Sequence, residues 1–208
     1  MTRAQFLPGI REVAAADWNA LAGRDYPFLR HEFLCALEDS ASVGGDSGWE
    51  PHHLLLREGA RLVGAMPCYL KRHSYGEYVF DWSWADAYRR HGQPYYPKLL
   101  SAVPFTPAAG PRLLLAEGLA FADVQAELLA AVREEMARLG ASSWHLLFPE
   151  QPVAGELAAA GLGHRTGVQF HWNNRGYRDF ADFLELMQSR KRKQLKRERR
   201  LVLEQGLQ

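Results

Sequence analysis

An amphipathic segment from Ala120 to Leu139 constrains the fold of this 208-residue chain more than any other stretch. It is rich in Ala, Leu and Glu, its apolar side chains recur at helical steps, and Gly140 ends the pattern. Apolar runs at 112–115 and 144–148 flank it, and such runs are typical of buried strands. A helix that crosses between two strands predicts an α/β fold.

The rest of the chain predicts helices first and a sheet after them. Alternating or continuous apolar runs predict strands, and apolar residues at three- and four-residue steps predict helices. A tight Glu58-Gly59-Ala60 turn predicts that two of the strands form an antiparallel hairpin. Strands are expected at 10–13, 49–57, 61–70, 78–82 and 164–172, and helices at 17–23, 31–39, 85–90, 96–102, 152–160 and 179–206.

The composition places the chain among globular proteins, because 47% of its residues are hydrophobic and 24% are charged. It contains no run of about 18 apolar residues and no apolar core of the signal-peptide type near its N-terminus. We therefore expect a cytoplasmic protein without a transmembrane segment.

The cysteines and histidines predict neither a metal site nor a disulfide. Cys35 and Cys68 lack the spacing of metal ligands and are expected to be buried thiols. His52 and His53 are adjacent on an expected strand, so their side chains point to opposite faces and cannot share a metal ion. The sequence also lacks the nucleophile-elbow, phosphate-loop and zinc-protease motifs.

The stretch from Cys68 to Arg112 is the best candidate for a binding segment, since it holds ten of the 24 aromatic residues and five of the 11 prolines. Asp81 and Asp86 lie there among bulky aromatic residues, where desolvation would raise a carboxyl pKa toward the range of a general base. We take both as catalytic candidates. The structural alternative is that Asp81 ends a strand and Asp86 caps the next helix.

Other side chains of this stretch are suited to holding a ligand. Tyrosine, lysine and arginine can donate hydrogen bonds to a carboxylate or phosphate, and aromatic rings offer stacking surfaces. Packing into the core is an equally open alternative for the whole group. The candidate substrate-binding residues are Trp82, Trp84, Tyr88, Tyr95, Tyr96, Lys98 and Arg112.

A basic block near the C-terminus contains eight basic residues and one acid, whereas the rest of the chain is mildly acidic. The block lies on an expected helix of about 40 Å that runs from 179 to 206 and is polar on all sides. Contact with a nucleic acid or another polyanion is one interpretation, and a solvated helix face is the other. The basic residues are Arg190, Lys191, Arg192, Lys193, Lys196, Arg197, Arg199 and Arg200.

Five phrases, in this order along the chain, resemble a known family. They are FLRHEFLCALEDSASVG, LVGAMPCYLKRHSYGEYVFDWSWADAY, YYPKLLSAVPFTPAAGPRLL, QFHWNNRGY and SRKRKQLKRERR. They resemble the bacterial FemAB-like predicted N-acyltransferases, also called peptidoglycan biosynthesis or recognition proteins.

The resemblance implies two tandem domains of the GNAT fold, of which the order of elements here fits the first. We therefore expect a GNAT-like α/β domain at 1–178, with a mixed, largely antiparallel sheet flanked by helices. The long basic helix or interdomain arm would follow at 179–208. The family is roughly twice as long as this chain, so we expect the second GNAT-like domain to be missing, and this half alone to be inactive.

The resemblance also implies donors and acceptors. The better-known Fem enzymes take aminoacyl-tRNA and extend the peptide of a peptidoglycan precursor, so tRNA is an expected partner of the basic helix. Acyl-CoA is the alternative donor, and no tightly bound cofactor is expected. The coenzyme A loop of ordinary GNAT enzymes is absent, because Ala116-Glu117-Gly118-Leu119-Ala120 has one glycine and an acid where a pyrophosphate needs backbone N–H groups.

Three hypotheses about function follow. The leading one is the first half of an N-acyl or aminoacyl transferase, with Cys68 to Arg112 forming the pocket for an amine acceptor. The second is a non-catalytic module that binds nucleic acid or another polyanion through the basic helix. The third is a degenerate half kept for assembly with its second domain.

Overall fold

The computed structural model describes residues 2–168 and 170–206. The chain divides into two compact units, residues 1–164 and 165–208. This division falls earlier than the domain boundary expected at residue 178. The first unit contains both sheets and most helices, and the second contains two helices.

One sheet of the first unit is antiparallel throughout and has the strand order β1-β3-β4-β7. The expected hairpin is confirmed, because β3 and β4 pair across the turn at Gly59, which has a left-handed φ of 60°. The strands are β1 (Thr2–Leu7), β3 (His53–Glu58), β4 (Arg61–Met66) and β7 (Leu114–Leu115).

A second sheet has the order β2-β5-β6-β8, and its last pair is parallel. The expected strands 49–57 and 61–70 are each divided between the two sheets. Pro67 lies at the second break, where proline has no N–H to donate to a strand partner. The strands are β2 (Trp49–Pro51), β5 (Tyr69–Lys71), β6 (Lys98–Ser101) and β8 (Trp144–Leu146).

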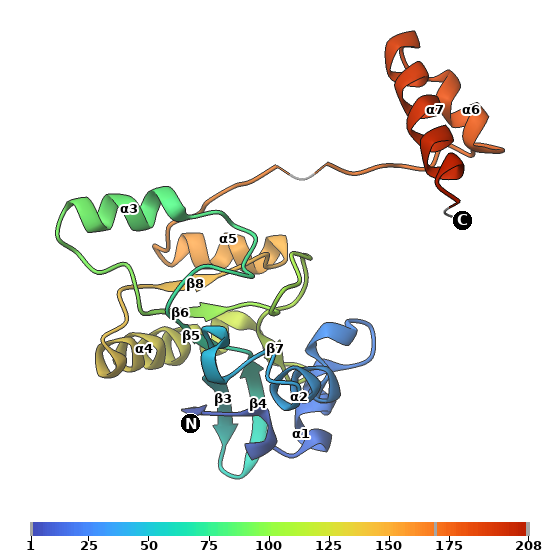
Figure 1. The fold of residues 1–208 in the computed structure, drawn as a ribbon. Helices are drawn as coiled ribbons and strands as arrows, with labels where there is room; N and C mark the ends of the chain where they lie inside the picture. Colours follow the sequence, from blue (N-terminus) through green and yellow to red (C-terminus); the bar gives the residue numbers. More distant parts are fainter. Residues whose placement is uncertain (1, 169, 207–208) are drawn as a thin grey trace. The chain divides into compact units, whose positions relative to one another are not determined.

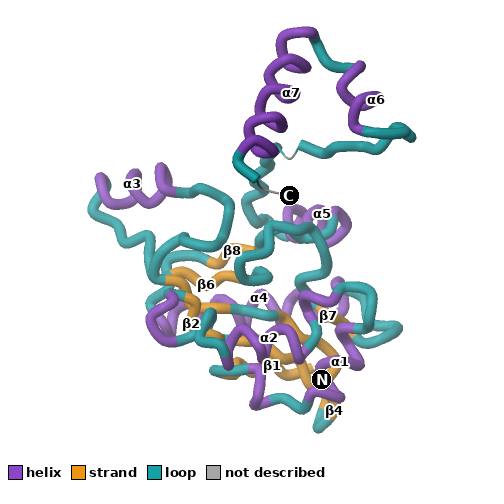
Figure 2. Tube along the Cα trace, turned by 45° about the vertical axis from the view of Figure 1, so that its right-hand side comes forward, coloured by secondary structure: helices purple, strands orange, loops and turns teal. Residues whose placement is uncertain are grey.

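Helices cover the antiparallel sheet on both faces (Figure 2). On one face α4 (Phe121–Leu139) buries Val124 and Leu128 against Leu54 and Leu56. On the other, Trp18 and Leu34 pack with Leu55. The remaining helices of this unit are α1 (Ala15–Ala22), α2 (His31–Asp39), α3 (Trp82–Arg90) and α5 (Gln151–Ala159), with short 3-10 turns at Ile10–Glu12, Pro27–Leu29 and Gly45–Ser47.

Several expected elements of this unit are wrong. Residues 10–12 form a 3-10 turn, and the first strand is β1 instead. Residues 78–81 are not a strand, because Tyr78 and Phe80 have left-handed φ angles of 61° and 52°, and α3 begins at Trp82. The segment 96–102 contains the strand β6 instead of a helix, because it completes the second sheet beside β5.

The second unit also differs from expectation. Residues 164–168 and 170–172 form no strand. The single helix expected from 179 to 206 is two helices, α6 (Phe180–Glu185) and α7 (Ser189–Glu204), because Gln188 between them has a ψ of 144°, outside the helical range. Asp179 caps α6 as expected, accepting a hydrogen bond from the Asp182 backbone. No helix in the described part of the chain is long and apolar enough to cross a membrane.

Neighbouring histidines tie the sheet to a helix on each face. His53 is fully buried and its Nε2 lies 2.9 Å from Glu38 Oε1, while Glu38 also accepts the Ile10 N–H at 3.1 Å. His52 contacts Glu135 on α4. The two histidines therefore point to opposite faces, as the strand alternation predicts.

We predict that Glu38→Ala destabilises the fold by about 1–3 kcal/mol, because it leaves a buried ring nitrogen and a backbone N–H without their acceptor. Its neighbour Asp39 provides the control, since it pairs with Arg11 at the surface. Asp39→Ala should have a much smaller effect. Urea unfolding midpoints measure both, and equal midpoints for the two variants would contradict the assignment.

Candidate functional site

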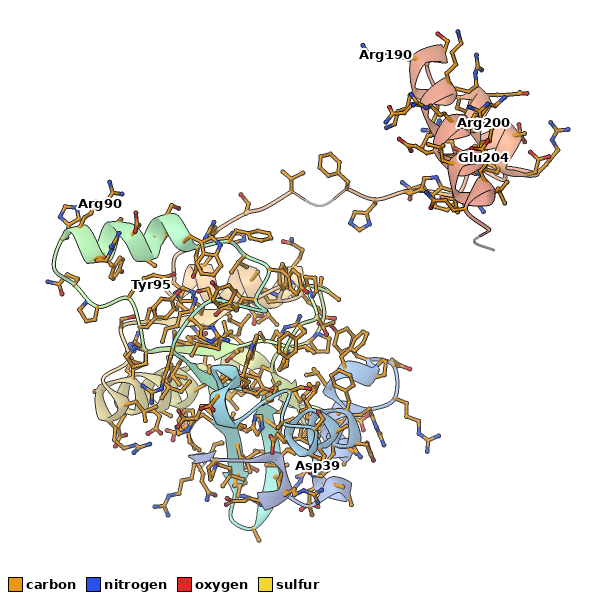
Figure 3. All side chains as sticks on the ribbon, viewed as in Figure 1. Asp39, Arg90, Tyr95, Arg190, Arg200 and Glu204 are labelled. Carbon is orange, nitrogen blue, oxygen red and sulfur yellow. The ribbon has the colours of Figure 1, made fainter. Side chains whose placement is uncertain are left out.

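The stretch from Cys68 to Arg112 leaves the second sheet and returns to it. It comprises β5, a loop at 72–81, helix α3, strand β6 and a loop at 102–113. Figure 3 shows Arg90 at the far end of α3 and Tyr95 on the segment that leads back to β6. The structure places the candidate residues at three separate places along this path.

A buried polar cluster lies where β5 and β6 pair. Lys71 and Lys98 face each other across the two strands, and both side chains are fully buried. The Lys98 ammonium donates to Asp81 Oδ2 at 2.7 Å, to Glu77 Oε2 at 2.9 Å and to Ser74 Oγ at 3.0 Å. Lys98 therefore joins strand β6 to three residues of the 72–81 loop.

Asp81 is held as an anion, which corrects the expectation of a raised pKa. Burial by itself opposes its ionisation, but hydrogen bonds from Lys98, Ser74 and Tyr95 outweigh burial and lower its pKa to about 2. The Tyr95 hydroxyl donates to Asp81 Oδ2 at 2.6 Å. A carboxylate with so low a pKa is a weak base at neutral pH.

Lys71 and Glu77 are the other charged members of the cluster. Burial, opposed by Glu77 and reinforced by Lys98, lowers the pKa of Lys71 to about 7. Its Nζ donates to the Tyr75 carbonyl at 3.1 Å and lies 3.8 Å from the Trp49 ring centre. Burial raises the pKa of Glu77. Within the described residues, one oxygen each of Glu77 and Asp81 is buried without a hydrogen-bond partner.

Two tyrosines line the same cluster. Tyr96 shares a hydrogen bond of 2.7 Å with Ser74, and the Lys98 Nζ lies 5.2 Å from the Tyr95 ring centre and 5.6 Å from that of Tyr96. Burial raises the pKa of both phenols, so they stay protonated at neutral pH. The structure thus brings together Asp81, Tyr95, Tyr96 and Lys98.

The other aromatic candidates and Asp86 lie on α3, outside the cluster. Asp86 is exposed and forms an ion pair of 2.6 Å with Arg89. Trp82, Trp84 and Tyr88 are also exposed, and Tyr88 makes an edge contact with Tyr95. The two carboxylates that the sequence groups together therefore have different surroundings.

Arg112 lies at the far end of the stretch and is 1% exposed. Its guanidinium donates to the carbonyls of Leu147, Pro111 and Ala108. Burial lowers its pKa. The contact with Leu147 fastens the 102–113 loop to the end of β8, and the three contacts together leave the side chain closed to a ligand.

An open cleft lies beside this loop. It has a volume of about 380 Å³ and is bounded by the end of α1, the 109–111 backbone and the start of α5. The Tyr26 ring forms one wall and rests so close to Gly110 that a side chain there would collide with it. Asp25 and Glu150, both exposed, place carboxylates at the rim.

Sequence reasoning missed Lys71, Ser74 and Glu77 in the cluster, and Tyr26 and Glu150 at the cleft. One signal was available for the first, because Lys71 and Lys98 each adjoin an apolar run, where a lysine must find a buried partner. The cleft residues come from segments that are far apart in the sequence, and no local pattern connects them.

The basic block lies on α7, where no residue is buried. Arg192 is half-buried and the other seven basic residues are exposed. Arg199 lies 4.2 Å from the Phe180 ring centre on α6, and Arg200 pairs with Glu204 at 3.3 Å. Most of the positive charge of α7 is therefore open to solvent.

We predict that Lys71→Met removes a pH dependence of stability. The unfolded chain protonates this lysine below its ordinary pKa of 10.5, and the folded protein only below about 7. Stability from this group therefore rises with pH between about 7 and 10.5. The difference between the urea midpoints of the wild type and Lys71→Met should therefore increase from about pH 7 to 10.5. The same difference for the control Lys193→Met, on the exposed helix α7, should not change in this way. A flat difference for Lys71→Met would contradict the assignment.

Solved structures resemble the fold of this chain at low sequence identity. The aminoglycoside N-acetyltransferase AAC(6')-Iy in complex with CoA shares 12% identity, with a TM-score of 0.50 over 84% of this chain and 95% of that chain. A ribosomal-protein-alanine N-acetyltransferase from Brucella melitensis biovar Abortus 2308 shares 12% identity, with a TM-score of 0.46 over 85% of this chain and 100% of that chain. The GNAT-like α/β fold expected from the resemblance is confirmed.

Sequence comparison identifies the family. No curated protein sequence matches the chain significantly. The sequence model of the FemAB-like family, described as peptidoglycan biosynthesis/recognition, matches residues 9–208. Because this match covers nearly all of the chain, the protein belongs to the FemAB-like family.

Proposed function

We propose that the protein is an N-acyltransferase that moves an acyl or aminoacyl group onto an amine, with a peptidoglycan precursor as the acceptor. The observation that carries this proposal is the family match over residues 9–208, on a chain with a GNAT-like fold. In the reaction, the amine nitrogen bonds to the carbonyl carbon of an ester or thioester. The C–O or C–S bond breaks, the alcohol or thiol leaves, and the amine loses a proton.

The cleft beside the 102–113 loop is the proposed acceptor site. It is open to solvent, and the carboxylates of Asp25 and Glu150 at its rim can attract the ammonium group of an acceptor. The Tyr26 hydroxyl is close by and lies 3.3 Å from the Ala108 carbonyl. Holding the amine in one orientation is the main contribution that such a cleft makes to the rate.

The buried cluster is proposed to position the site instead of taking the proton. Asp81 is paired with Lys98 and Tyr95 and has a pKa of about 2, which argues against a role as general base. The cluster fixes β6, and the 102–113 loop continues directly from β6 to the cleft. A change at Asp81 would therefore reach the cleft through the backbone.

Two features support a donor other than coenzyme A. The segment before α4 has one glycine, Gly118, and the Asp123 carboxylate accepts a hydrogen bond of 2.8 Å from the Ala120 N–H. A pyrophosphate at this helix N-terminus would meet that negative charge. The exposed cations of α7 suit a polyanionic donor, so we propose aminoacyl-tRNA with α7 contacting its phosphates.

The assay mixes the full-length protein with a peptidoglycan precursor that carries a free amine, and with either acyl-CoA or aminoacyl-tRNA. We expect mass spectrometry to detect the acylated amine with aminoacyl-tRNA. Neutralising Lys191, Arg192, Lys196 and Arg197 to Ala should raise the KM for tRNA steeply and reduce its salt dependence.

Acylation from acyl-CoA alone would overturn the donor proposal and leave the reaction class intact. No product with either donor, from protein that unfolds cooperatively, would contradict the transferase proposal. Salt-sensitive tRNA binding without transfer would favour the second candidate, a non-catalytic polyanion-binding module, which the exposed cations of α7 also support.

We predict that Asp81→Asn lowers turnover on the order of tenfold or more, because it removes one of the two carboxylate charges that pair with the buried Lys98 ammonium. Asp86→Asn is the matched control, since Asp86 is exposed and pairs only with its helix neighbour Arg89 within the described contacts. It should stay near the wild-type rate. Both variants are compared by kcat and by the pH profile of kcat. Equal losses in both, or loss of the acid limb from the pH profile of Asp81→Asn, would contradict the positioning role of Asp81.

A further inference from the structure

Exposed aromatic side chains gather on the part of the chain that covers the buried cluster. Six of them are between 42% and 71% exposed, although large apolar residues usually pack away from water. We name them the aromatic surface. Its members are Tyr75, Tyr78, Phe80, Trp82, Trp84 and Phe105.

Some rings of the aromatic surface lie close together. The rings of Tyr75 and Trp82 lie 5.0 Å apart, and the Phe105 ring covers Gly76 so closely that a side chain there would collide with it. Tyr78 and Phe80 lie on the same short loop between Tyr75 and Trp82. The aromatic surface therefore draws on three neighbouring segments, the 72–81 loop, the start of α3 and the 102–113 loop, which meet at Tyr75, Trp82 and Phe105.

Two of these residues are held in a strained backbone conformation. Tyr78 and Phe80 have φ angles of 61° and 52°, in the left-handed region that bulky residues rarely adopt. Strain of this kind costs about 1–3 kcal/mol per residue and recurs at binding surfaces. Their rings are 51% and 71% exposed, so burial of the rings does not offset the strain.

Arginines border the aromatic surface. Arg72, Arg89 and Arg90 are exposed; Arg72 pairs with Glu50 at 3.4 Å and Arg89 with Asp86 at 2.6 Å, and exposed pairs of this kind are weak enough to be exchanged for lipid phosphate. The other two acids of the segment 72–91, Glu77 and Asp81, are buried against Lys98. The solvent therefore meets aromatic rings bordered by arginines.

The aromatic surface also projects from the body. Helix α3 buries none of its residues, and it stands away from the sheets in both views (Figures 1 and 2). Sites for sugars and other small ligands are concave. A projecting, aromatic and cationic segment matches the chemistry of a bilayer interface, where Trp and Tyr settle at headgroup level and Arg meets anionic lipid.

We infer that the aromatic surface docks the protein on an anionic lipid bilayer as a peripheral membrane protein. Phe80 and Trp84 enter the interface, and Arg72, Arg89 and Arg90 contact lipid phosphates. The inference does not depend on the acyl-transfer reaction. Because the 102–113 loop carries Phe105 and also borders the cleft, docking would bring the proposed acceptor site to a membrane, where a lipid-linked acceptor would be presented.

The test is co-sedimentation of the protein with vesicles of phosphatidylcholine alone, and with vesicles that also contain phosphatidylglycerol. We expect binding to the anionic vesicles. The Phe80→Asn, Trp84→Gln double variant should weaken it roughly tenfold or more. Both side chains are exposed, and Asn tolerates a left-handed φ, so the thermal midpoint should stay near wild type.

The basic helix α7 can also meet anionic lipid, so the variant with Lys191, Arg192, Lys196 and Arg197 changed to Ala is the matched control. It should keep most of the vesicle binding. In a Trp172→Phe background, brominated lipid should quench the emission of Trp82 and Trp84. This readout holds even if the double variant unfolds.

Three results would overturn the inference. The first is no binding of the wild-type protein to anionic vesicles. The second is full binding by the double variant with loss of binding in the α7 variant, which would assign the lipid contact to α7. The third is wild-type binding of a soluble muropeptide, lost in the double variant, without any vesicle binding; this would make the surface a glycan site.

Discussion

The ammonium group of Lys98 is the contact on which the rest of the first unit's functional region depends. It is fully buried and bonds to two carboxylates and a hydroxyl that all come from the 72–81 loop. Removing one partner of such a cluster leaves an uncompensated charge inside the protein, at a cost of about 3–5 kcal/mol. A neutral side chain of similar volume at every position would avoid that cost. The charges therefore specify where the loop sits more than they add stability.

This anchor explains how the loop above it can hold a conformation that its own residues disfavour. Glu77 and Asp81 flank Tyr78 and Phe80, which have left-handed φ angles, and both acids form buried ion pairs with Lys98. With both ends of the five-residue span from Glu77 to Asp81 fixed, the residues between them must take up the strain, and the rings of Tyr78 and Phe80 are exposed to solvent. The buried polar cluster and the exposed aromatic surface are thus two sides of one local structure.

The sequence predicted those elements whose pattern is local. Helix α4, helix α2 and the β3–β4 hairpin were predicted because each is specified by periodicity or by turn residues within the element itself. The elements predicted at 78–82 and 96–102 were wrong because tertiary contacts determine the structure of both segments. Lys98 holds the first as a loop, and the second contains β6, which pairs with β5. At the site, Asp81, Tyr95 and Lys98 were selected as candidates. The direction of the Asp81 pKa shift does not follow from the local sequence, because burial alone would raise the pKa and the cation that lowers it, Lys98, lies on β6, 17 residues further along the chain.

The division between a closed cluster and an open cleft limits where chemistry can occur. An acceptor amine cannot reach Asp81 while Lys98, Tyr95 and the 72–81 loop enclose it, whereas Tyr26, Gly110 and Glu150 border a space already open to solvent. The cluster and the cleft are connected by a single segment, because β6 begins at Lys98 and continues into the 102–113 loop. At the end of that loop, Arg112 attaches it to the end of β8. One end of that segment is fixed by buried charge and the other by the hydrogen bond from Arg112 to the Leu147 carbonyl, so the backbone between them is held at two points. A cleft wall held in this way stays in place when a ligand binds, and orientation of an acceptor requires that rigidity.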